Sequence, residues 1–432
     1  MTSWSRLTSM KVLVVSRLFS GLKGSLAEGR WNPSGVPAIY KLVENLACTN
    51  DINLALVILS READTCFTQI RKMKLAPFGI DTLVLPWRTG WPNRLNELVQ
   101  TIGVLAFMCT WRPDVAYFTN AGFVPAGLAA RFRLAPIVFR FLGIFPVHKQ
   151  LAEGGRKLAR WLYRAPFAHV VCSLDGSGGE YYLKRLLDRR VPLSVLLNGV
   201  DIVTNTTARP NLRKYFGFDT RPIITYLGRL ERFKGADEFV AALQRLEQLR
   251  PDSFQALIIG DGPLKDDLEC TLSASSLTDR VHFTGAIAHK EVAKHLAISD
   301  IYVSLNRYGG LSNANLEAIA AGRCILMLSS DPAGHIDLVT DELVPYDVIE
   351  RLPRTGTVEA LANALARLVT DPAEIDHRAR AVSALADRLL NDWNVRIERE
   401  IAFITSAARP RRRPFAWRRA GPACRGQEGG GE

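Results

Sequence analysis

The 432-residue sequence has no apolar run long enough to cross a lipid bilayer. A membrane-spanning helix needs about 20 apolar residues. The longest candidate, Leu98 to Trp111, is shorter and contains Gln100. The first residues carry one positive charge and lead directly into a predicted strand, without the apolar segment of a secretory signal. We therefore expect a cytoplasmic protein without a transmembrane helix.

The sequence also lacks cysteines at metal-ligand spacing. Its seven cysteines are scattered along the chain, and no two stand at the short intervals typical of zinc sites. Most of them lie in apolar stretches, which indicates buried, reduced thiols. The cysteine pattern therefore predicts neither a metal site nor a disulfide framework.

Positive charge is in excess and is unevenly distributed. The net charge is +12, and the stretch from Arg409 to Glu432 supplies +5 of it, seven Arg minus two Glu. Because no nucleic-acid-binding motif accompanies this charge, we expect no nucleic-acid partner. An anionic membrane surface or an anionic substrate fits the balance. The composition of residues 409–432 predicts a disordered basic tail.

Residues 139–164 combine basic and aromatic side chains. A helix with such side chains on neighbouring faces can lie on an anionic bilayer. A solvated basic face over an ordinary core contact explains the same pattern. Both interpretations stay open from the sequence.

Short apolar and β-branched runs alternate with helical patterns along most of the chain. This alternation predicts βαβ units and doubly wound parallel sheets, whose ligands bind at the carboxyl ends of the strands. The predicted strands of the first half are 11–16, 52–59, 80–86, 114–118, 136–142, 169–173 and 191–197. Those of the second half are 222–227, 254–259, 281–285, 301–305 and 323–328.

One loop in the second half has the composition of a phosphate site. The strand 222–227 ends in Gly228-Arg229-Leu230, and Lys234-Gly235 precedes a helix predicted from Ala236. Two cations, glycines that allow close backbone approach and a helix start suit a diphosphate. We therefore predict an anion site on this loop.

Two further turns follow in the same half. The strand 254–259 ends in Gly260-Asp261-Gly262-Pro263. After Gly309-Gly310, a helix is predicted with Ser312 or Asn313 as N-cap and Gly322 as its stop.

In this order and spacing, the motifs resemble the C-terminal domain of family 4 glycosyltransferases. Asn198-Gly199-Val200-Asp201 resembles the end of the N-terminal domain of the same family, so the resemblance spans roughly Lys11 to Ile404. It implies an α/β fold of the GT-B type, with two Rossmann-like doubly wound parallel-sheet domains facing across a cleft. The implied parts are residues 9–203, residues 204–388, a helix over 389–408 that crosses back to the N-terminal domain, and the tail 409–432.

The resemblance also implies an activity. Family members transfer a sugar from a nucleotide-sugar donor to a hydroxyl acceptor with retention of configuration. They need no metal, and the donor is a substrate, so no cofactor is expected. We expect a hexosyl-type transferase that acts on a glycan or lipid-linked acceptor in polysaccharide, lipopolysaccharide or glycoconjugate assembly. The inner face of a membrane is its expected surface.

Site residues carry over from the resemblance by position. Arg229 and Lys234 match the catalytic phosphate-binding pair, and Glu317 matches a glutamate that accepts hydrogen bonds from the ribose hydroxyls. The remaining donor-binding residues are Gly228, Gly260, the cleft-facing Gly35, and the backbone amides of Leu311, Ser312 and Asn313.

The chain departs from the family pattern at two places. The first of the family's paired glutamates would fall at position 309, where this chain has Gly309. No histidine stands at the end of a middle strand of the first half, and Asn120, Arg140 and His148 stay open as acceptor-side residues. These departures motivate an alternative, a catalytically reduced protein that binds a nucleotide sugar or a partner. A nonhydrolysing sugar epimerase on the same scaffold fits the phosphate loop less well.

Overall fold

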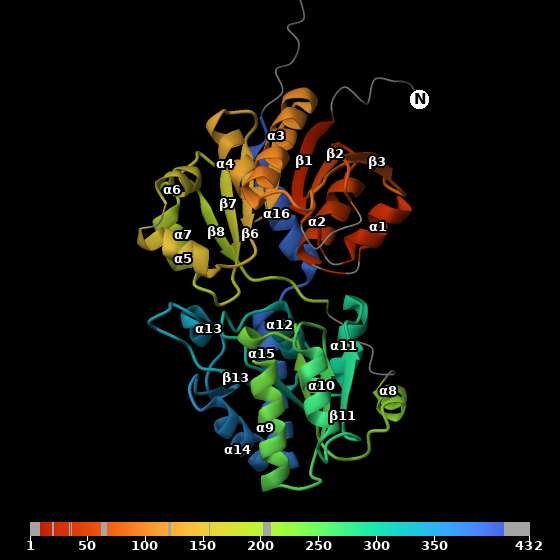
Figure 1. The fold of residues 1–432 in the computed structure, drawn as a ribbon. Helices are drawn as coiled ribbons and strands as arrows, with labels where there is room; N and C mark the ends of the chain where they lie inside the picture. The colour runs from red at the N-terminus through yellow and green to blue at the C-terminus, as the bar shows by residue number, and fades with distance from the viewer. Residues whose placement is uncertain are drawn as a thin grey trace, which may run out of the picture.

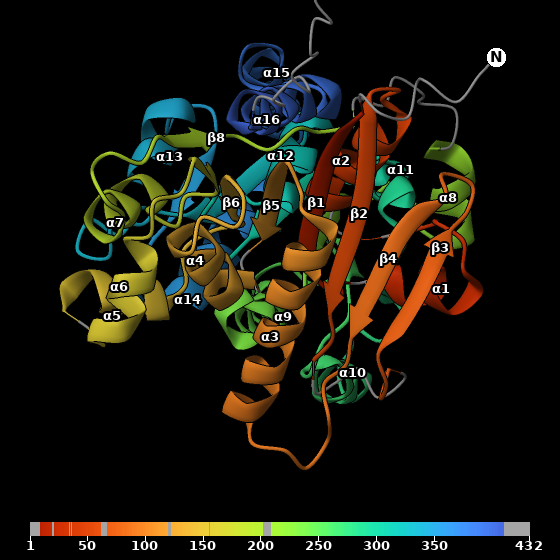
Figure 2. The same cartoon turned by 90° about the horizontal axis from the view of Figure 1, so that it is seen from above.

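The computed structural model describes residues 9–19, 21–33, 35, 37–61, 67–119, 122–154, 156–201 and 209–409. Within them the chain forms two α/β domains, one above the other in Figure 1 and seen from above in Figure 2. The predicted boundary at 203/204 and the tail beyond Arg409 lie outside the described residues, as does Asn120.

The N-terminal domain is built on an eight-stranded sheet of order β3-β4-β2-β1-β5-β6-β7-β8. Its strands are parallel except β3, which pairs with β4 in antiparallel fashion. The order reverses between β1 and β5, which makes the carboxyl ends of these strands a topological switch point. The strands are β1 (Met10–Arg17), β2 (Ile52–Leu59), β3 (Arg71–Leu75), β4 (Ile80–Leu85), β5 (Val115–Thr119), β6 (Ile137–Phe141), β7 (His169–Ser173) and β8 (Leu193–Leu196).

Helices cover both faces of this sheet (Figure 2). Apolar side chains of strands and helices form two clusters, one on each face. The helices are α1 (Leu22–Glu28), α2 (Pro37–Cys48), α3 (Asn93–Trp111), α4 (Phe123–Arg131), α5 (Pro146–Glu153), α6 (Lys157–Tyr163) and α7 (Gly179–Leu186).

The C-terminal domain is built on a six-stranded parallel sheet of order β11-β10-β9-β12-β13-β14. The order reverses between β9 and β12, so the loops after these two strands lie at the switch point where ligands of such sheets bind. The strands are β9 (Ile223–Leu227), β10 (Gln255–Ile259), β11 (Val281–Gly285), β12 (Ile301–Ser304), β13 (Cys324–Leu328) and β14 (Glu350–Leu352).

Helices flank this second sheet (Figure 1). They are α8 (Arg209–Tyr215), α9 (Ala236–Leu249), α10 (Lys265–Ser273), α11 (His289–Ile298), α12 (Asn313–Ala320), α13 (Leu338–Leu343), α14 (Thr357–Leu368) and α15 (Pro372–Leu389). The predicted two-domain GT-B fold is confirmed, and it places the carboxyl ends of both sheets around the space between the domains.

The last helix, α16 (Trp393–Ala407), returns to the N-terminal domain. Trp393, Ile397 and Ile404 are buried in the apolar cluster of that domain, and α16 packs on α2 and on strands β5, β6 and β7. In Figure 1 the helix runs behind the upper sheet while α15 lies in the lower domain. The predicted crossing helix is therefore confirmed.

A buried ionic network fastens α16 to the sheet. The carboxylate of Glu400 accepts hydrogen bonds from Tyr117 and from Arg140, each at 2.5 Å. Arg396 contacts the same carboxylate. Glu400 and Arg140 are both 0% exposed. Such charges are stable in the interior only as a set, because removal of one partner leaves another desolvated and unpaired.

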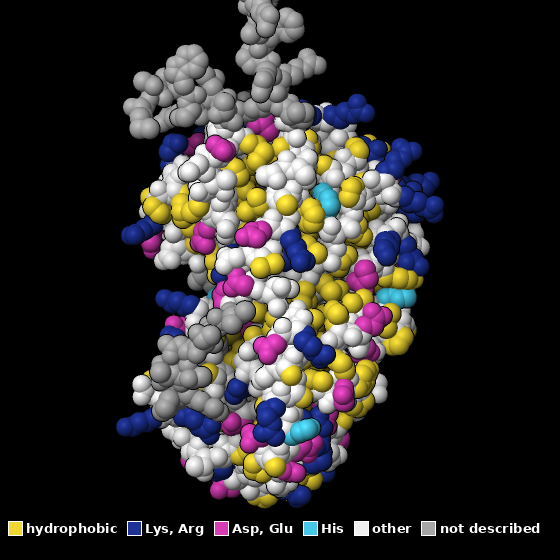
Figure 3. Space-filling model, turned by 180° about the vertical axis from the view of Figure 1, so that it is seen from behind, with side chains coloured by type: hydrophobic (Ala, Val, Ile, Leu, Met, Phe, Trp, Pro, Cys, Tyr) yellow, Lys and Arg dark blue, Asp and Glu magenta, His cyan; other side chains and the backbone are white. Residues whose placement is uncertain are grey.

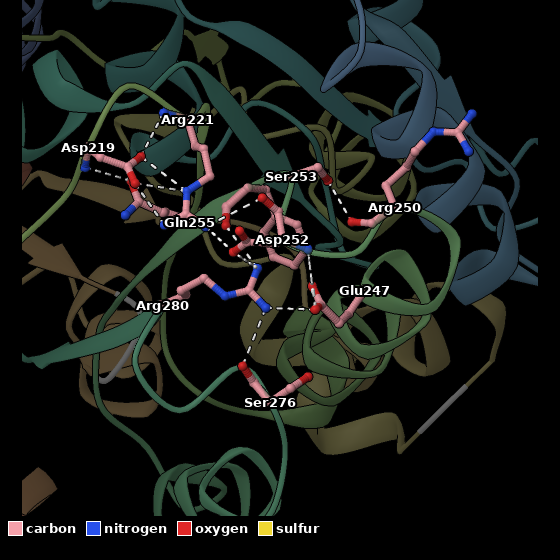
Figure 4. A network of polar contacts seen from close by, with 10 residues as sticks. Asp219, Arg221, Glu247, Arg250, Asp252, Ser253, Gln255, Ser276 and Arg280 are labelled. Carbon is pink, nitrogen blue, oxygen red and sulfur yellow. Dashed lines mark hydrogen bonds and ion pairs between the residues drawn. The ribbon is translucent and has the colours of Figure 1, made fainter.

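At the amino ends of the C-terminal strands, charged side chains neutralise one another (Figure 4). Arg280 contacts Glu247 at 2.7 Å, and Arg221 contacts Asp219 at 2.7 Å. Arg221 also forms an ion pair with Asp252. This end of the sheet is therefore tied into a structural network, and the chemistry of the domain lies at the opposite end.

The cysteine expectation holds only in part. Among the described cysteines, Cys172 and Cys324 are buried free thiols. Cys48, Cys109 and Cys270 are exposed, so burial was the wrong expectation for these three. They lie on helices where a small side chain is tolerated at the surface.

Candidate functional site

Two cavities open at the carboxyl ends of the C-terminal strands. The first, here called the interdomain cavity, has a volume of about 560 Å³. The second, the donor-domain cavity, has a volume of about 690 Å³. The N-terminal domain contributes Gly143, Ser173 and Asp175 to the interdomain cavity, and the C-terminal domain contributes Lys234, Ser312 and Asn313. The donor-domain cavity is lined by Gly228, Arg229, Gly260, Gly262, Ile287 and Val292.

Lys234 presents a positive charge to the interdomain cavity. It ends a short 3₁₀ turn, and Gly235 with φ +71° begins α9 directly after it. Its ammonium group makes no hydrogen bond or ion pair with any described residue. Burial lowers the pKa of Lys234, against the opposing charges of Asp175 and Glu231. A partly desolvated cation without a close partner favours binding of an anion.

Arg229 lies on the same loop but lines the donor-domain cavity. Its side chain is 70% exposed, and its Nε lies 2.6 Å from Oε1 of Glu231. The two predicted phosphate residues therefore line different cavities.

Gly228 and Gly260, the two predicted glycines of the donor-domain cavity, differ in whether the surrounding structure leaves room for a side chain. A Cβ at Gly260 would lie 1.9 Å from the carbonyl oxygen of Gly228, and φ at Gly260 is +141°. Only glycine fits there. A Cβ at Gly228 would meet nothing nearer than the Tyr226 hydroxyl at 3.5 Å. Internal packing therefore does not require Gly228, and its open face is available to a ligand.

The loop before α12 does not offer all of the predicted amides. Ser312 is the N-cap residue, as expected, but its side chain makes no capping hydrogen bond. Asn313 lines the interdomain cavity, and its Oδ1 accepts a hydrogen bond from Asn198 at 2.7 Å. The prediction for Leu311 is wrong, because its amide donates to the carbonyl of Asp175 at 3.1 Å and is not free for a phosphate.

Glu317 lies in a polar chain that joins the two domains. Its Oε1 is 2.7 Å from Nε2 of His289, and Nδ1 of His289 is 3.4 Å from Asp201. Asp201 in turn pairs with Lys41 of α2 at 2.8 Å. Burial alone would lower the pKa of His289, but the hydrogen bond and charge of Glu317, with the charge of Asp201, raise it. Glu317 borders neither cavity directly in this conformation.

Of the residues left open for the acceptor side, Arg140 and His148 are described. Arg140 is 0% exposed and bound to Glu400, so its side chain does not reach an acceptor site. His148 is buried, its Nδ1 accepts the amide of Phe145 at 2.9 Å, and burial lowers its pKa to about 4. Gly35 is half-buried and lines neither cavity, although Ala38 of the following helix lines the interdomain cavity.

The Asn-Gly-Val-Asp motif contributes to the junction between the domains. Asn198 accepts a hydrogen bond from Arg140 at 3.1 Å and donates to Asn313 at 2.7 Å. A Cβ at Gly199 would lie 2.5 Å from Cα of Trp393. The motif therefore links the buried network of α16 to the loop before α12.

Asp175, Asn198 and His289 were not among the residues predicted for the site. His289 and Asp175 each follow a strand that ends at the space between the domains, so their positions alone were a signal. Within the described ranges, no three His, Cys, Asp or Glu residues lie together in a way that could hold a metal ion. No helix in those ranges is both long and apolar enough to span a bilayer.

Sequence comparisons match the C-terminal domain to a known family. Residues 208–385 match the family of glycosyl transferases group 1. An alpha-D-kanosaminyltransferase of Streptomyces kanamyceticus is 33% identical over 164 residues, 38% of this chain and 40% of that protein. A 2-deoxystreptamine N-acetyl-D-glucosaminyltransferase of Streptomyces fradiae is 26% identical over 305 residues, 65% of this chain and 68% of that protein. The match to the first relative thus spans less than half of its length.

Solved structures resemble the whole two-domain arrangement. HepE of Anabaena in complex with UDP has a TM-score of 0.65 at 18% identity, covering 92% of this chain and 100% of that chain. Sucrose-phosphate synthase of Thermosynechococcus elongatus has a TM-score of 0.67 at 17% identity, covering 92% and 98%. Residues 208–385 thus match the model of glycosyl transferases group 1, and they form the second domain of a GT-B fold.

Proposed function

We propose that this protein transfers a sugar from a nucleoside-diphosphate sugar to a hydroxyl group of a glycan or lipid-linked acceptor. The observation that carries the proposal is the ammonium group of Lys234, without a hydrogen bond or ion pair in the described ranges, on the loop that also carries Arg229 and that two cavities adjoin. Similar proteins support it, since HepE was solved with UDP and with UDP-glucose, and the curated relatives include GDP-mannose-dependent mannosyltransferases.

In this proposal the donor spans both cavities. The nucleoside lies in the donor-domain cavity against Gly228 and Gly260, and the diphosphate lies between Arg229 and Lys234. The sugar extends into the interdomain cavity, near Ser312 and Asn313. Glu317 accepts hydrogen bonds from the ribose hydroxyls, which requires it to exchange its contact with His289 for the ligand.

The chemistry follows from charge development on the leaving group. As the bond between the sugar carbon and the diphosphate oxygen breaks, negative charge grows on the phosphate oxygens, and fixed cations stabilise that charge. The acceptor oxygen forms the new bond to the same carbon, and its proton leaves to the diphosphate or to water. We propose retention of configuration, and we assign the electrostatic role to Arg229 and Lys234, without a metal ion.

The acceptor enters from the N-terminal domain in this proposal. A basic cavity of about 620 Å³ is lined by the ends of α5 and α7, by Arg164 directly after α6, and by the segment that follows α7. Beside it Leu158 is 71% exposed and Trp161 is 43% exposed. Figure 3 shows basic side chains gathered along the edge of the upper domain that carries α5, α6 and α7 in Figure 1. The cations of the basic cavity are Arg164, Lys184, Arg185, Arg189 and Arg190.

Basic and exposed apolar side chains together suit an anionic bilayer surface. We therefore propose that the protein is cytoplasmic and contacts the inner face of a membrane through this edge. Vesicles that contain anionic lipid should bind the protein at low salt and release it at high salt, whereas neutral vesicles should not bind it.

The proposed function is tested first by mass spectrometry of nucleotides that copurify with the protein. A screen for hydrolysis and transfer of UDP-, GDP- and dTDP-sugars follows. We expect one donor class to be retained and turned over. If a nucleotide sugar binds through Glu317 but no acceptor or water removes the sugar, the alternative of a binding protein replaces the enzyme. If no nucleotide sugar binds, the proposed function is wrong.

A further inference from the structure

The absence of a side chain at position 309 has a structural cause. Gly309 has φ +136°, and a Cβ there would lie 2.2 Å from the carbonyl oxygen of Asp175 and 2.9 Å from the carbonyl carbon of Gly176. A glutamate at this position would therefore be strained and would collide with backbone of the other domain. The space that a glutamate would need is occupied by a loop of the N-terminal domain.

That loop, residues 174–178, is seated on the C-terminal domain by backbone hydrogen bonds. The Leu311 amide donates to the Asp175 carbonyl at 3.1 Å, and the Asp337 amide donates to the Gly176 carbonyl at 2.7 Å. Gly176 has φ +86°, and a Cβ there would lie 2.1 Å from Oδ1 of Asp337. The contact is therefore built for glycine on both sides, and it carries the side chain of Asp175 to the interdomain cavity.

The Asp175 carboxylate is held in place on one side only. Its Oδ1 accepts hydrogen bonds from the amide of Ser177 at 3.0 Å and from the hydroxyl of Ser177 at 2.5 Å. The Ser177 hydroxyl is itself fixed, because it accepts the amide of Ile144 at 2.8 Å. Oδ2 accepts no hydrogen bond from another described residue, and it lies where a Cβ at Gly143 would be 2.1 Å away. One oxygen thus anchors the group and the other stays available.

The surroundings of this oxygen suit a sugar. Asp175 lines the same cavity as Lys234 and Asn313, so an occupant there would contact a carboxylate, an ammonium group and the α12 loop together. A carboxylate accepts two or more hydrogen bonds, and hydroxyl groups are the donors that a neutral sugar provides in several directions. A negatively charged group at the same place would be repelled by the carboxylate.

We propose that Asp175 binds hydroxyl groups of the donor sugar and selects neutral, hydroxylated sugars over uronic acids. This inference rests on the proposed function and adds a specificity-determining residue to it. Asp175 thus supplies a carboxylate to this cavity from the N-terminal domain. The donor-sugar subsite is complete only while the loop 174–178 is seated on the loop 309–311.

The test compares Asp175→Asn with wild type by calorimetric titration of UDP, UDP-glucose and UDP-glucuronic acid, and of GDP and GDP-mannose if guanosine nucleotides are preferred. Asparagine keeps an oxygen for Ser177 but removes the charge. We expect unchanged affinity for the nucleoside diphosphate, about tenfold weaker binding of the neutral sugar nucleotide, and a smaller preference over the uronic acid. The control is Asp51→Asn, an exposed carboxylate of the same domain.

The outcomes separate this inference from the proposed function. If wild type binds none of the nucleotides, both are wrong. If wild type binds them and Asp175→Asn leaves the ratio of sugar-nucleotide to nucleoside-diphosphate affinity unchanged, the assignment of Asp175 alone is wrong. Ser177→Ala is the second variant, for the case that Asp175→Asn does not fold. Ser177→Ala keeps the charge of Asp175 but removes the hydroxyl group that anchors it. We expect a smaller loss in the ratio of sugar-nucleotide to nucleoside-diphosphate affinity. An unchanged ratio would contradict the inference.

Discussion

Cationic side chains near the interdomain cavity differ between the two domains in their burial and in their partners. In the C-terminal domain, the ammonium group of Lys234 has no hydrogen bond or ion pair within the described ranges, and Arg229, which pairs with Glu231, is 70% exposed. In the N-terminal domain, Arg140 stands near the carboxyl end of β6 but is 0% exposed and paired with Glu400. One domain keeps cations available to an anionic ligand, while the other uses a cation to fasten the last helix. The sign and number of charges in a domain therefore say little about its role until their partners are known.

The largest expected effect is the loss of stability when the buried ionic network that holds α16 is broken. Glu400→Ala leaves Arg140 and Arg396 without their shared carboxylate in the interior, so the free energy of unfolding should fall by about 3–5 kcal/mol. Chemical denaturation followed by circular dichroism measures this fall. The matched control is Glu398→Ala, an exposed residue of the same helix. Equal, small changes in both variants would show that the network does not fasten α16.

The second effect sharpens the comparison within the C-terminal domain. Gly260→Ala forces a Cβ to 1.9 Å from the Gly228 carbonyl at φ +141°, so we expect a loss of stability of about 1–3 kcal/mol. Gly228→Ala has open space on that side and should leave stability within about 0.5 kcal/mol of wild type. It should nevertheless weaken binding of UDP or GDP, because the methyl group enters the donor-domain cavity.

Thermal unfolding and nucleotide titration of the two glycine variants separate packing from ligand contact. A loss of stability in Gly228→Ala but not in Gly260→Ala would contradict the conclusion that packing requires glycine at position 260 and not at position 228. Unchanged nucleotide affinity in a folded Gly228→Ala would remove the donor-domain cavity from the proposed site.

The smallest effect is a dependence on pH. Burial raises the pKa of Asp337 from 3.8 to about 6. Between about pH 4 and pH 6, the carboxyl group of Asp337 is protonated in the folded state and ionised in the unfolded state. The contribution of this group to stability therefore falls as the pH rises through that range. Asp337→Asn removes the ionisation and keeps an oxygen for the Gly310 amide and the Thr340 hydroxyl. Asparagine also tolerates the left-handed backbone at this position, where φ is +62°.

The melting temperature of Asp337→Asn relative to wild type should therefore be higher at about pH 7.5 than at about pH 4.5. Asp376→Asn, which changes an exposed carboxylate of the same domain, serves as control. A difference between variant and wild type that does not change with pH would contradict the raised pKa.

The strand β9 and the loop after it could be predicted because their sequence signals are local. Gly228, Arg229 and Lys234 lie within seven positions of one another, directly after an apolar strand. The strand β3 was missed because Arg71–Leu75 is mostly charged and exposed, so it lacks the apolar pattern of a buried strand. Charged residues are common on edge strands of this kind.

The junction between the domains could not be predicted in the same way. Asp175 and Gly309 contact each other although they are far apart in the chain, and their contact depends on how two sheets face one another. The occupation of the Leu311 amide by a carbonyl of the other domain has the same origin. No local pattern encodes such pairs, and an arginine in a strand, such as Arg140, gives no sign of whether a distant glutamate will meet it.

The most direct test of the account is the titration of UDP and GDP into Lys234→Ala, with wild type and the exposed-residue control Lys214→Ala alongside. Loss of charge-assisted hydrogen bonds to a diphosphate costs about 1.5–3 kcal/mol. We predict that Lys234→Ala binds the preferred nucleoside diphosphate about tenfold or more weakly, while Lys214→Ala binds it as wild type does. A folded Lys234→Ala with wild-type affinity would contradict the claim that this cation holds the diphosphate of a sugar donor.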